Sequence, residues 1–173
     1  MKRHWFLWGS GALLASDQIL KAYAEQNLDK KEERKLTEKV VLRRVNNHGM
    51  CLNLLSDRPG VVRILSAAAA GTVTVLQVVS LMRKKGFWRK KGLALMAAGA
   101  WSNTFDRCAR GHVVDYIGFR SENKKISDVT YNLGDFFIAA GGVTALLASL
   151  SVNVTSKKKN GRKSRAEEEP AEQ

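Results

Sequence analysis

Long apolar stretches alternate with short charged blocks along this chain of 173 residues. The apolar stretches cover residues 5–23, 61–82, 92–109 and 133–154. Each is close to the ~20 residues that a helix needs to cross the hydrocarbon core of a bilayer. The pattern therefore predicts an all-α integral membrane protein with four transmembrane helices.

The first stretch also has features of a cleaved signal peptide. It follows a basic start, is apolar in its middle and carries small residues at positions 15–16. We favour a retained helix, because the three later spans need a packing partner in the membrane. Trp5, Trp8 and Tyr23 then fall at the two membrane interfaces, where aromatic side chains are enriched.

The polar segments between these helices predict a small sheet. Residues 39–45 are β-branched and alternating, which is typical of a short strand, and residues 46–50 are rich in turn formers. Residues 51–55 fit a returning strand, and the charged run 29–39 fits a solvated loop or helix. Residues 111–132 predict an amphipathic segment at the membrane surface. We expect an extracytoplasmic β-sheet cradle beside this segment.

The distribution of charge sets the expected orientation. The formal net charge is +13, and residues 83–91 form a strongly basic loop without an acid. Basic loops stay on the cytoplasmic side, as does the basic start of the tail at 155–173, which we expect to be disordered. Residues 1–154 then form one multi-pass domain with both termini in the cytoplasm. Since the basic blocks flank apolar segments, we expect no nucleic-acid partner.

The predicted topology brings the polar residues of the helices to one depth, at the outer membrane surface. Ionisable side chains in membrane segments are costly and usually mark a functional site. Asn103, Asp106 and Arg107 lie near the outer end of the third helix and share one face by their spacing. The others are Asp17 near the outer end of the first helix, Asp115 after the third and Asp135 at the start of the fourth.

Asp115 and Asp135 are the best candidates for acid–base chemistry, because each lies at a junction between helix and loop that a substrate can reach. Two neighbouring carboxyl groups cannot both ionise cheaply, so they share a proton. The ionised group then takes a proton from water, and the protonated group polarises a carbonyl. This chemistry needs neither a metal nor an organic cofactor, and an amide bond near the membrane surface is its natural substrate.

Each acid also has a structural alternative. Asp135, three residues after Asn132, resembles the acid of a capping box at a helix start. The remaining alternatives are ion pairs, of Asp106 with Arg107 and of Asp17 with Lys21 or Arg107.

Histidine and cysteine indicate no other chemistry. His48 and His112 lie outside without a serine nucleophile in a familiar context, and His112 beside Asp115 lacks a third metal ligand at a suitable spacing. Cys51 and Cys108 form no metal or redox motif, and they are interpreted as small hydrophobic residues. The sequence does not decide whether these two cysteines form a disulfide.

Five blocks of the sequence resemble, in order, the motifs of the bacterial lipoprotein signal peptidases (signal peptidase II). Together they cover most of residues 10–140, and as a set they are highly specific. The chain departs from the family pattern at Leu52, Ser102 and Gly134, none of which is a catalytic group. The blocks are SDQILK at 16–21, NHGMCL at 47–52, GAWSNTFDR at 99–107, GHVVDYI at 111–117 and YNLGD at 131–135.

The resemblance implies an aspartic endopeptidase with Asp115 and Asp135 as its catalytic dyad. It implies that the enzyme removes the signal peptide from prolipoproteins, cutting just before a cysteine that carries diacylglycerol. Membrane lipids are the other expected partners, and a monomer in the bacterial cell membrane is the expected form. Family positions that line or brace the site fall on Asn47, Asn103, Arg107 and Asn132, and polar positions that support helix packing fall on Asp17, Lys21 and Asp106.

Two other classes of protein remain as alternatives. The first is a non-catalytic membrane adaptor of the same fold that binds lipid-modified chains. The second is a small proton-coupled transporter, which we rank last because its acids belong near the middle of the membrane and not at the outer edge.

Overall fold

The computed structural model describes residues 4–29, 32–50 and 54–167, with the backbone alone at residues 125 and 152–167. Four long helices lie at the four predicted spans, so the helical character of those stretches is confirmed. A helix satisfies its backbone groups internally, which is what an apolar segment in a membrane requires. They are α1 (His4–Asn27), α2 (Pro59–Met82), α3 (Phe87–Ala109) and α5 (Leu133–Glu167).

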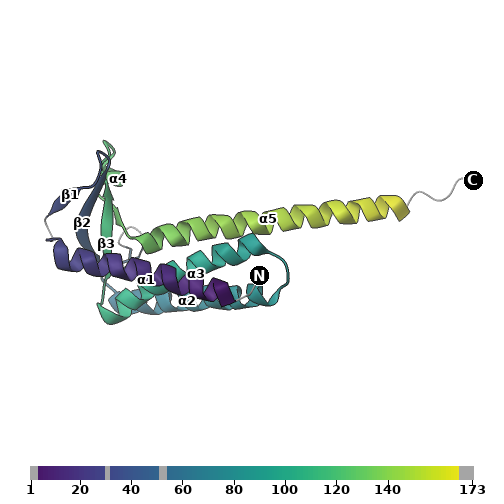
Figure 1. The fold of residues 1–173 in the computed structure, drawn as a ribbon, viewed down its shortest axis with the longest axis horizontal. Helices are drawn as coiled ribbons and strands as arrows, with labels where there is room; N and C mark the ends of the chain where they lie inside the picture. The colour runs from purple at the N-terminus through teal and green to yellow at the C-terminus, as the bar shows by residue number, and fades with distance from the viewer. Residues whose placement is uncertain (1–3, 30–31, 51–53, 168–173) are drawn as a thin grey trace, which may run out of the picture.

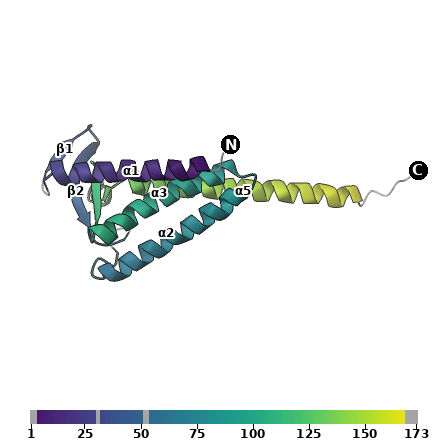
Figure 2. The same ribbon diagram turned by 60° about the horizontal axis from the view of Figure 1, so that its bottom comes forward.

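Helix α3 lies at the centre of the bundle and packs against α1, α2 and α5 (Figures 1 and 2). Its closest neighbour is α5, which it meets through glycines. A Cβ atom on Gly99 would lie 2.1 Å from the carbonyl oxygen of Gly134, and one on Gly92 would lie 2.6 Å from that of Gly141. Such close backbone approach is typical of helix contacts in membranes, where small residues line the interface.

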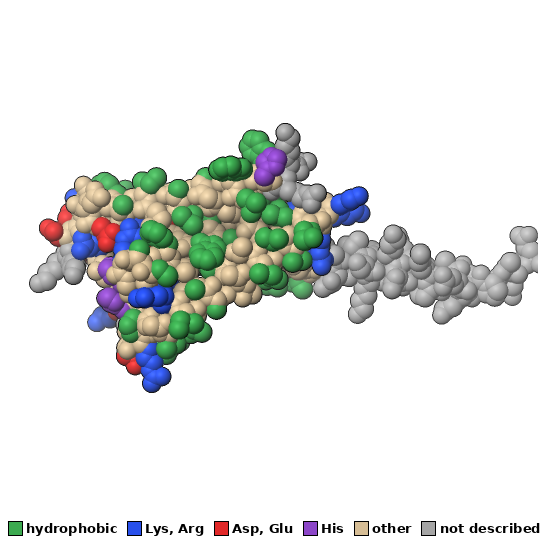
Figure 3. All heavy atoms as spheres, turned by 90° about the horizontal axis from the view of Figure 1, so that it is seen from below, with side chains coloured by type: hydrophobic (Ala, Val, Ile, Leu, Met, Phe, Trp, Pro, Cys, Tyr) green, Lys and Arg blue, Asp and Glu red, His purple; other side chains and the backbone are tan. Residues whose placement is uncertain are grey.

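The helices turn polar residues inward and apolar residues outward. Asp17 and Lys21 of α1 are completely buried, whereas Trp8 is 76% and Ile19 68% exposed. A soluble helix bundle has the opposite distribution, with apolar side chains inside and charged ones outside. Lipid favours the distribution seen here, because it solvates apolar side chains and not charged ones. Of the described helices, α2 and the first part of α5 are long and apolar enough to cross a membrane. Figure 3 shows charged side chains gathered toward the two ends of the molecule, with an apolar surface between them.

A four-stranded antiparallel sheet in the order β1-β2-β3-β4 closes one end of the bundle (Figure 1). In the central pair, Val45 of β2 is opposite Asp115 of β3, and Asn47 is opposite Val113. The register shifts between Leu42 and Val45, next to the position of Asp115. The strands are β1 (Glu33–Lys35), β2 (Val40–Asn47), β3 (Val113–Phe119) and β4 (Thr130–Tyr131), with a short helix α4 (Lys124–Ser127) between the last two.

The structure differs from the sequence prediction in three segments. In the segment 111–132, residues 113–119 are not amphipathic surface structure: β3 is a central strand that is buried on both faces, so it lacks the alternation of a half-exposed strand. Leu54 and Leu55 form a turn instead of a returning strand, and residues 51–53 lie outside the described residues. The backbone after residue 154 stays helical to Glu167 where we expected a disordered tail, and the lysine and arginine residues of this stretch favour helix.

Candidate active site

Asp115 lies in β3, at the junction of the sheet and the bundle. Its neighbours Val114 and Tyr116 point to the other side of the strand, where they join a buried cluster with Ala24 and Leu28 at the end of α1. This packing fixes the strand, and with it the direction of the Asp115 carboxyl group. Asp115 is itself only 3% exposed.

Asp135 lies in the first turn of α5, and the predicted capping box is present. The backbone N–H of Asp135 donates to Oδ1 of Asn132 at 3.0 Å, and the backbone N–H of Asn132 donates to Oδ2 of Asp135 at 3.1 Å. These reciprocal bonds satisfy donors at the start of the helix. They also hold the carboxyl group of Asp135 in one orientation, so the structural role and a chemical role are compatible.

Asn132 connects the two carboxyl groups. While its backbone N–H binds Asp135, its side-chain Nδ2 donates to Oδ1 of Asp115 at 2.6 Å. Because its Oδ1 already accepts from the backbone of Asp135, the amide can present only its NH₂ group to Asp115. Asn132 is completely buried, so bulk water does not compete for the hydrogen bonds of its side chain.

A second asparagine holds each carboxyl group from its other side. Asn47 donates from Nδ2 to Oδ2 of Asp115 at 3.0 Å, and its Oδ1 accepts from the backbone N–H of Gly49 at 3.0 Å. Arg107 in turn donates from Nη2 to the carbonyl oxygen of Gly49 at 2.8 Å. Arg107 thus positions the turn that carries Asn47, and through it Asp115.

Asn103 plays the corresponding part for Asp135. Its Nδ2 donates to Oδ1 of Asp135 at 2.9 Å, and its Oδ1 accepts from Nζ of Lys21 at 2.8 Å. The ammonium group therefore sets the orientation of the Asn103 amide. Each carboxyl group thus accepts hydrogen bonds from two asparagines. A cation orients one asparagine on each side, through the turn at Gly49 in the case of Arg107 and directly in the case of Lys21.

Lys21 is the centre of a buried ionic cluster between α1 and α3. Its Nζ lies 2.9 Å from Oδ2 of Asp17 and 2.9 Å from Oδ2 of Asp106. The predicted pairing of Asp17 with Lys21 is thus confirmed. The suggested pair of Asp106 with Arg107 is wrong: among the described residues Asp106 pairs with Lys21 and Arg110, because Arg107 points to the turn at Gly49.

Three contributors to this cluster were not identified from the sequence. Ser102 donates to Oδ2 of Asp17 at 2.6 Å, and the hydroxyl group of Tyr116 donates to Oδ1 of Asp17 at 3.1 Å. Gln18 donates to Oδ1 of Asp106 at 3.0 Å. A signal was available for all three, since each lies within one of the motif blocks, but nothing local indicates that Tyr116 reaches α1.

The surroundings of the site change the acidity of its groups outside the helices. Burial, followed by the nearby carboxylate of Asp135, raises the pKa of Asp115 to about 7. Burial and the adjacent Asp17 raise the pKa of the Tyr116 hydroxyl group, which keeps it protonated as a donor. Asp115 therefore holds its proton in neutral solution far more readily than an ordinary aspartate does.

The histidines and cysteines stand apart from this arrangement. The rings of His48 and His112 are 5.3 Å apart, and burial together with His48 lowers the pKa of His112. No group of three or more possible metal ligands occurs among the described residues. Cys108 is a free, exposed thiol, while Cys51 lies outside the described part of the chain.

Known proteins match most of the chain. Residues 10–151 match the family model described as signal peptidase (SPase) II. The lipoprotein signal peptidase of Pseudomonas paraeruginosa is 32% identical over 165 residues, which cover 90% of each chain. That of Nostoc punctiforme is 36% identical over 113 residues, or 65% of this chain and 67% of its own.

Two solved structures share the fold. A bacterial membrane enzyme determined by the in meso method at 2.3 Å resolution superimposes with a TM-score of 0.73 and 17% identity, covering 84% of this chain and 87% of its own. A second one, at 1.9 Å resolution, gives a TM-score of 0.69 and 18% identity, covering 84% of this chain and 92% of its own. The chain thus shares its arrangement of helices and sheet with these two proteins.

Proposed function

The chain belongs to the signal peptidase II family of aspartic peptidases, and on this premise we propose that Asp115 and Asp135 are its catalytic pair. The family cleaves signal peptides from prolipoproteins, and this is the activity of the chain. The observation that carries the assignment of the pair is Asn132, which donates to both carboxyl groups and so holds them at one site.

The two carboxyl groups take different roles because their surroundings differ. Asp115 is buried and has a pKa of about 7, so it carries the shared proton. Asp135 lies in the first turn of α5, where the helix dipole favours a negative charge, and it acts as the ionised base. This division follows the rule that two coupled carboxyl groups with different surroundings divide the acid and base tasks.

The reaction then proceeds in two proton-balanced steps. Asp135 takes a proton from a water molecule while the oxygen of that water attacks the scissile carbonyl carbon. At the same time Asp115 gives its proton to the carbonyl oxygen. When the tetrahedral intermediate collapses, the proton on Asp135 goes to the departing amide nitrogen and Asp115 recovers its own. The C–N bond breaks without a covalent enzyme intermediate, and the four fixed asparagine hydrogen bonds keep both carboxyl groups in place throughout.

We place all four long helices in the membrane with both termini in the cytoplasm. Each helix exposes large apolar side chains, examples being Trp8 of α1, Ile64 of α2, Phe105 of α3 and Leu146 of α5. Asp17 and Lys21 of α1 and Asp106 of α3 are buried and paired with one another, which makes these charges tolerable in a bilayer. One chain supplies both carboxyl groups and their partners, so we expect a monomer to be active.

Helix α3 is followed directly by strand β3, which carries Asp115, so the proposed pair lies where the bundle ends and the sheet begins. This position suits a substrate that is anchored in the bilayer and has its cleavage point at the surface. We therefore expect the substrate to be a prolipoprotein whose cysteine carries diacylglycerol, with cleavage just before that cysteine.

Purified protein incubated with two synthetic peptides tests this substrate class. Both contain the same prolipoprotein cleavage region, and only one carries diacylglycerol on its cysteine. Mass spectrometry should find a single cut before the cysteine in the lipidated peptide and little cleavage of the other. Equal cleavage of both peptides, or a cut elsewhere, would contradict the proposed specificity.

A further inference from the structure

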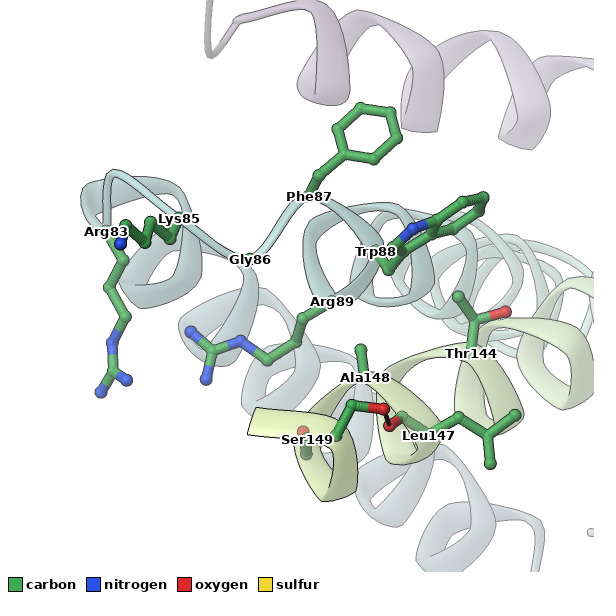
Figure 4. A pocket seen from close by; sticks show the side chains of 11 residues that line it. Arg83, Lys85, Gly86, Phe87, Trp88, Arg89, Thr144, Leu147, Ala148 and Ser149 are labelled. Carbon is green, nitrogen blue, oxygen red and sulfur yellow. Dashed lines mark hydrogen bonds between the residues drawn. The ribbon is translucent and has the colours of Figure 1, made fainter. Parts of the chain in front are cut away.

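A cavity of about 780 Å³ opens at the end of the bundle away from the sheet. It lies between the α2–α3 turn with the first residues of α3 on one side and the middle of α5 on the other (Figure 4). Its size is within the range of roughly 300–1,000 Å³ that is usual for small-ligand sites. The proposed catalytic residues lie at the opposite end, so the reaction does not account for it.

The walls on the side of the turn are cationic. Arg83, Lys85 and Arg89 line the cavity. The sequence has no aspartate or glutamate between residues 58 and 105, and none between 136 and 166. These three cations therefore lack the neighbouring carboxylates that balance charge at the other end of the bundle, and they form a site for an anion.

The turn that presents these cations is well braced. Nζ of Lys90 donates to the carbonyl oxygen of Arg83 at 2.6 Å, and Nε of Arg89 donates to Oγ of Ser80 at 3.2 Å. Gly86 has a φ of +91°, which favours glycine and lets the chain reverse directly into α3. No described side chain caps the start of α3, so its N–H groups add to the positive field there.

The wall on α5 contains Leu147 and Ala148, and its remaining lining residues, Thr144, Ser149 and Ser151, turn their hydroxyl groups to carbonyl oxygens of their own helix. Trp88 at the start of α3 adds an apolar surface on the side of the turn, and Leu147 is 58% and Trp88 62% exposed. The cavity lies where α2 ends at Met82 and where the apolar part of α5 ends at Ser151. A ligand that fills it must be anionic on one side and apolar on the other, and it must be present at the membrane surface.

We propose that this cavity binds an anionic phospholipid of the cytoplasmic leaflet. The phosphate contacts Arg83, Lys85 and Arg89, and an acyl chain lies along Trp88 and the apolar face of α5. Guanidinium groups suit this role because they bind phosphate oxygens in pairs. The site is separate from the catalytic pair, so bound lipid holds the α2–α3 turn against α5 without taking part in cleavage.

Native mass spectrometry of the full-length protein tests the proposal. The protein is released from detergent micelles that contain equal amounts of phosphatidylglycerol and phosphatidylcholine with the same acyl chains. We compare Arg83→Gln and Lys85→Gln with Lys84→Gln, which removes the same charge from the same turn but does not line the cavity. Ala148→Trp fills the apolar wall without changing the charge, and glycerol 3-phosphate serves as a soluble competitor.

We expect wild-type protein to retain phosphatidylglycerol in preference to phosphatidylcholine. Arg83→Gln and Lys85→Gln should each weaken this retention about five-fold, in line with the loss of one basic contact, whereas Lys84→Gln should not. Ala148→Trp should weaken the retention of both lipids, because its side chain occupies the space of the acyl chain. All variants should still cleave the lipidated peptide, which shows that they are folded and separates this test from that of the catalytic pair.

Three outcomes would overturn the proposal. Equal retention of the two lipids would mean that the cavity does not select an anion. An equal loss in Lys84→Gln would mean that diffuse surface charge, and not the cavity, attracts the lipid. Displacement of the lipid by an equal concentration of glycerol 3-phosphate would mean that the site recognises free phosphate.

Discussion

Asn132 shows how one residue positions both carboxyl groups of the proposed catalytic pair. Its backbone N–H binds Asp135 and its amide binds Asp115, so the two carboxyl groups cannot be positioned independently. The sequence marks Asn132 as a helix cap, and the resemblance marks it as a residue of the site. The structure shows why Asn132 combines these two roles: the pairing of β3 with β4 brings Asp115 beside the start of α5, where Asn132 caps the helix.

The acidity of Asp115 predicts the pH dependence of cleavage. Because its pKa is raised to about 7, the group keeps its proton below that pH and loses it above. Cleavage requires the singly protonated pair, so kcat/KM should fall as the pH rises through about 7 to 8, by roughly ten-fold per pH unit beyond the pKa. Initial rates on the lipidated peptide between pH 5 and 9 provide the measurement. A profile that stays flat from pH 6 to 9 would rule out Asp115 as the proton donor.

At the scale of elements, the contact of α3 with α5 positions the catalytic region. Asn103 of α3 must reach Asp135 of α5, and the two helices can approach closely enough because Gly99 and Gly134 face each other. The sequence indicated an apolar third helix rich in small residues, but not which helix it meets. That choice depends on tertiary packing, which a single sequence with four similar helices does not reveal.

Because a single sequence does not show which faces are covered by packing, β3 in the segment 111–132 was predicted as an amphipathic surface segment. A strand with one solvated face alternates between polar and apolar residues, but β3 is covered on both faces and its residues 113–117 do not alternate. Asp115 was still identified, because its position after the third helix depends on topology and not on the type of secondary structure. The cradle sheet was predicted from residues 39–45, where the β-branched pattern is clear.

Gly99→Ala tests the contact between the helices. The added methyl group would lie 2.1 Å from the carbonyl oxygen of Gly134, so the helices must separate. We expect a loss of stability of at least about 1–3 kcal/mol, as for other overpacked contacts, together with reduced cleavage because Asn103 moves away from Asp135. Thermal unfolding in detergent measures the first effect and peptide cleavage the second.

Gly71→Ala is the matched control, because a Cβ atom there has no neighbour within 4 Å. It should leave both stability and cleavage near the wild-type values. If Gly99→Ala also behaves like the wild type, the close approach of α3 and α5 does not occur in the folded protein.

For the whole molecule, the main claim is its orientation in the membrane. The turn between α2 and α3 and the start of α1 lie at one end of the bundle, and the sheet lies at the other (Figure 1). The charge pattern predicts that the first end lies in the cytoplasm, since six of the nine residues 83–91 are basic. Cys108, near the end of α3 that adjoins the sheet, is exposed and should then face outward.

Labelling of intact spheroplasts tests this orientation. In a Cys51→Ser background, a membrane-impermeant maleimide should modify Cys108 without lysis. A Lys84→Cys variant that lacks both native cysteines should react only after the membrane is opened. Labelling of the residue at position 84 in intact spheroplasts, with Cys108 protected, would reverse the proposed topology.

The catalytic pair is tested most directly by the single-turnover rate of two variants, Asp115→Asn and Asp135→Asn, on the lipidated peptide. Asparagine keeps the size and polarity of each side chain but can neither ionise nor carry the shared proton. Asp128→Asn, an exposed change in the same outer region, serves as the control and should cleave normally. The account predicts that both site variants lose activity by at least about 10²–10⁴-fold while remaining folded. Cleavage at the wild-type rate by either of them would contradict it.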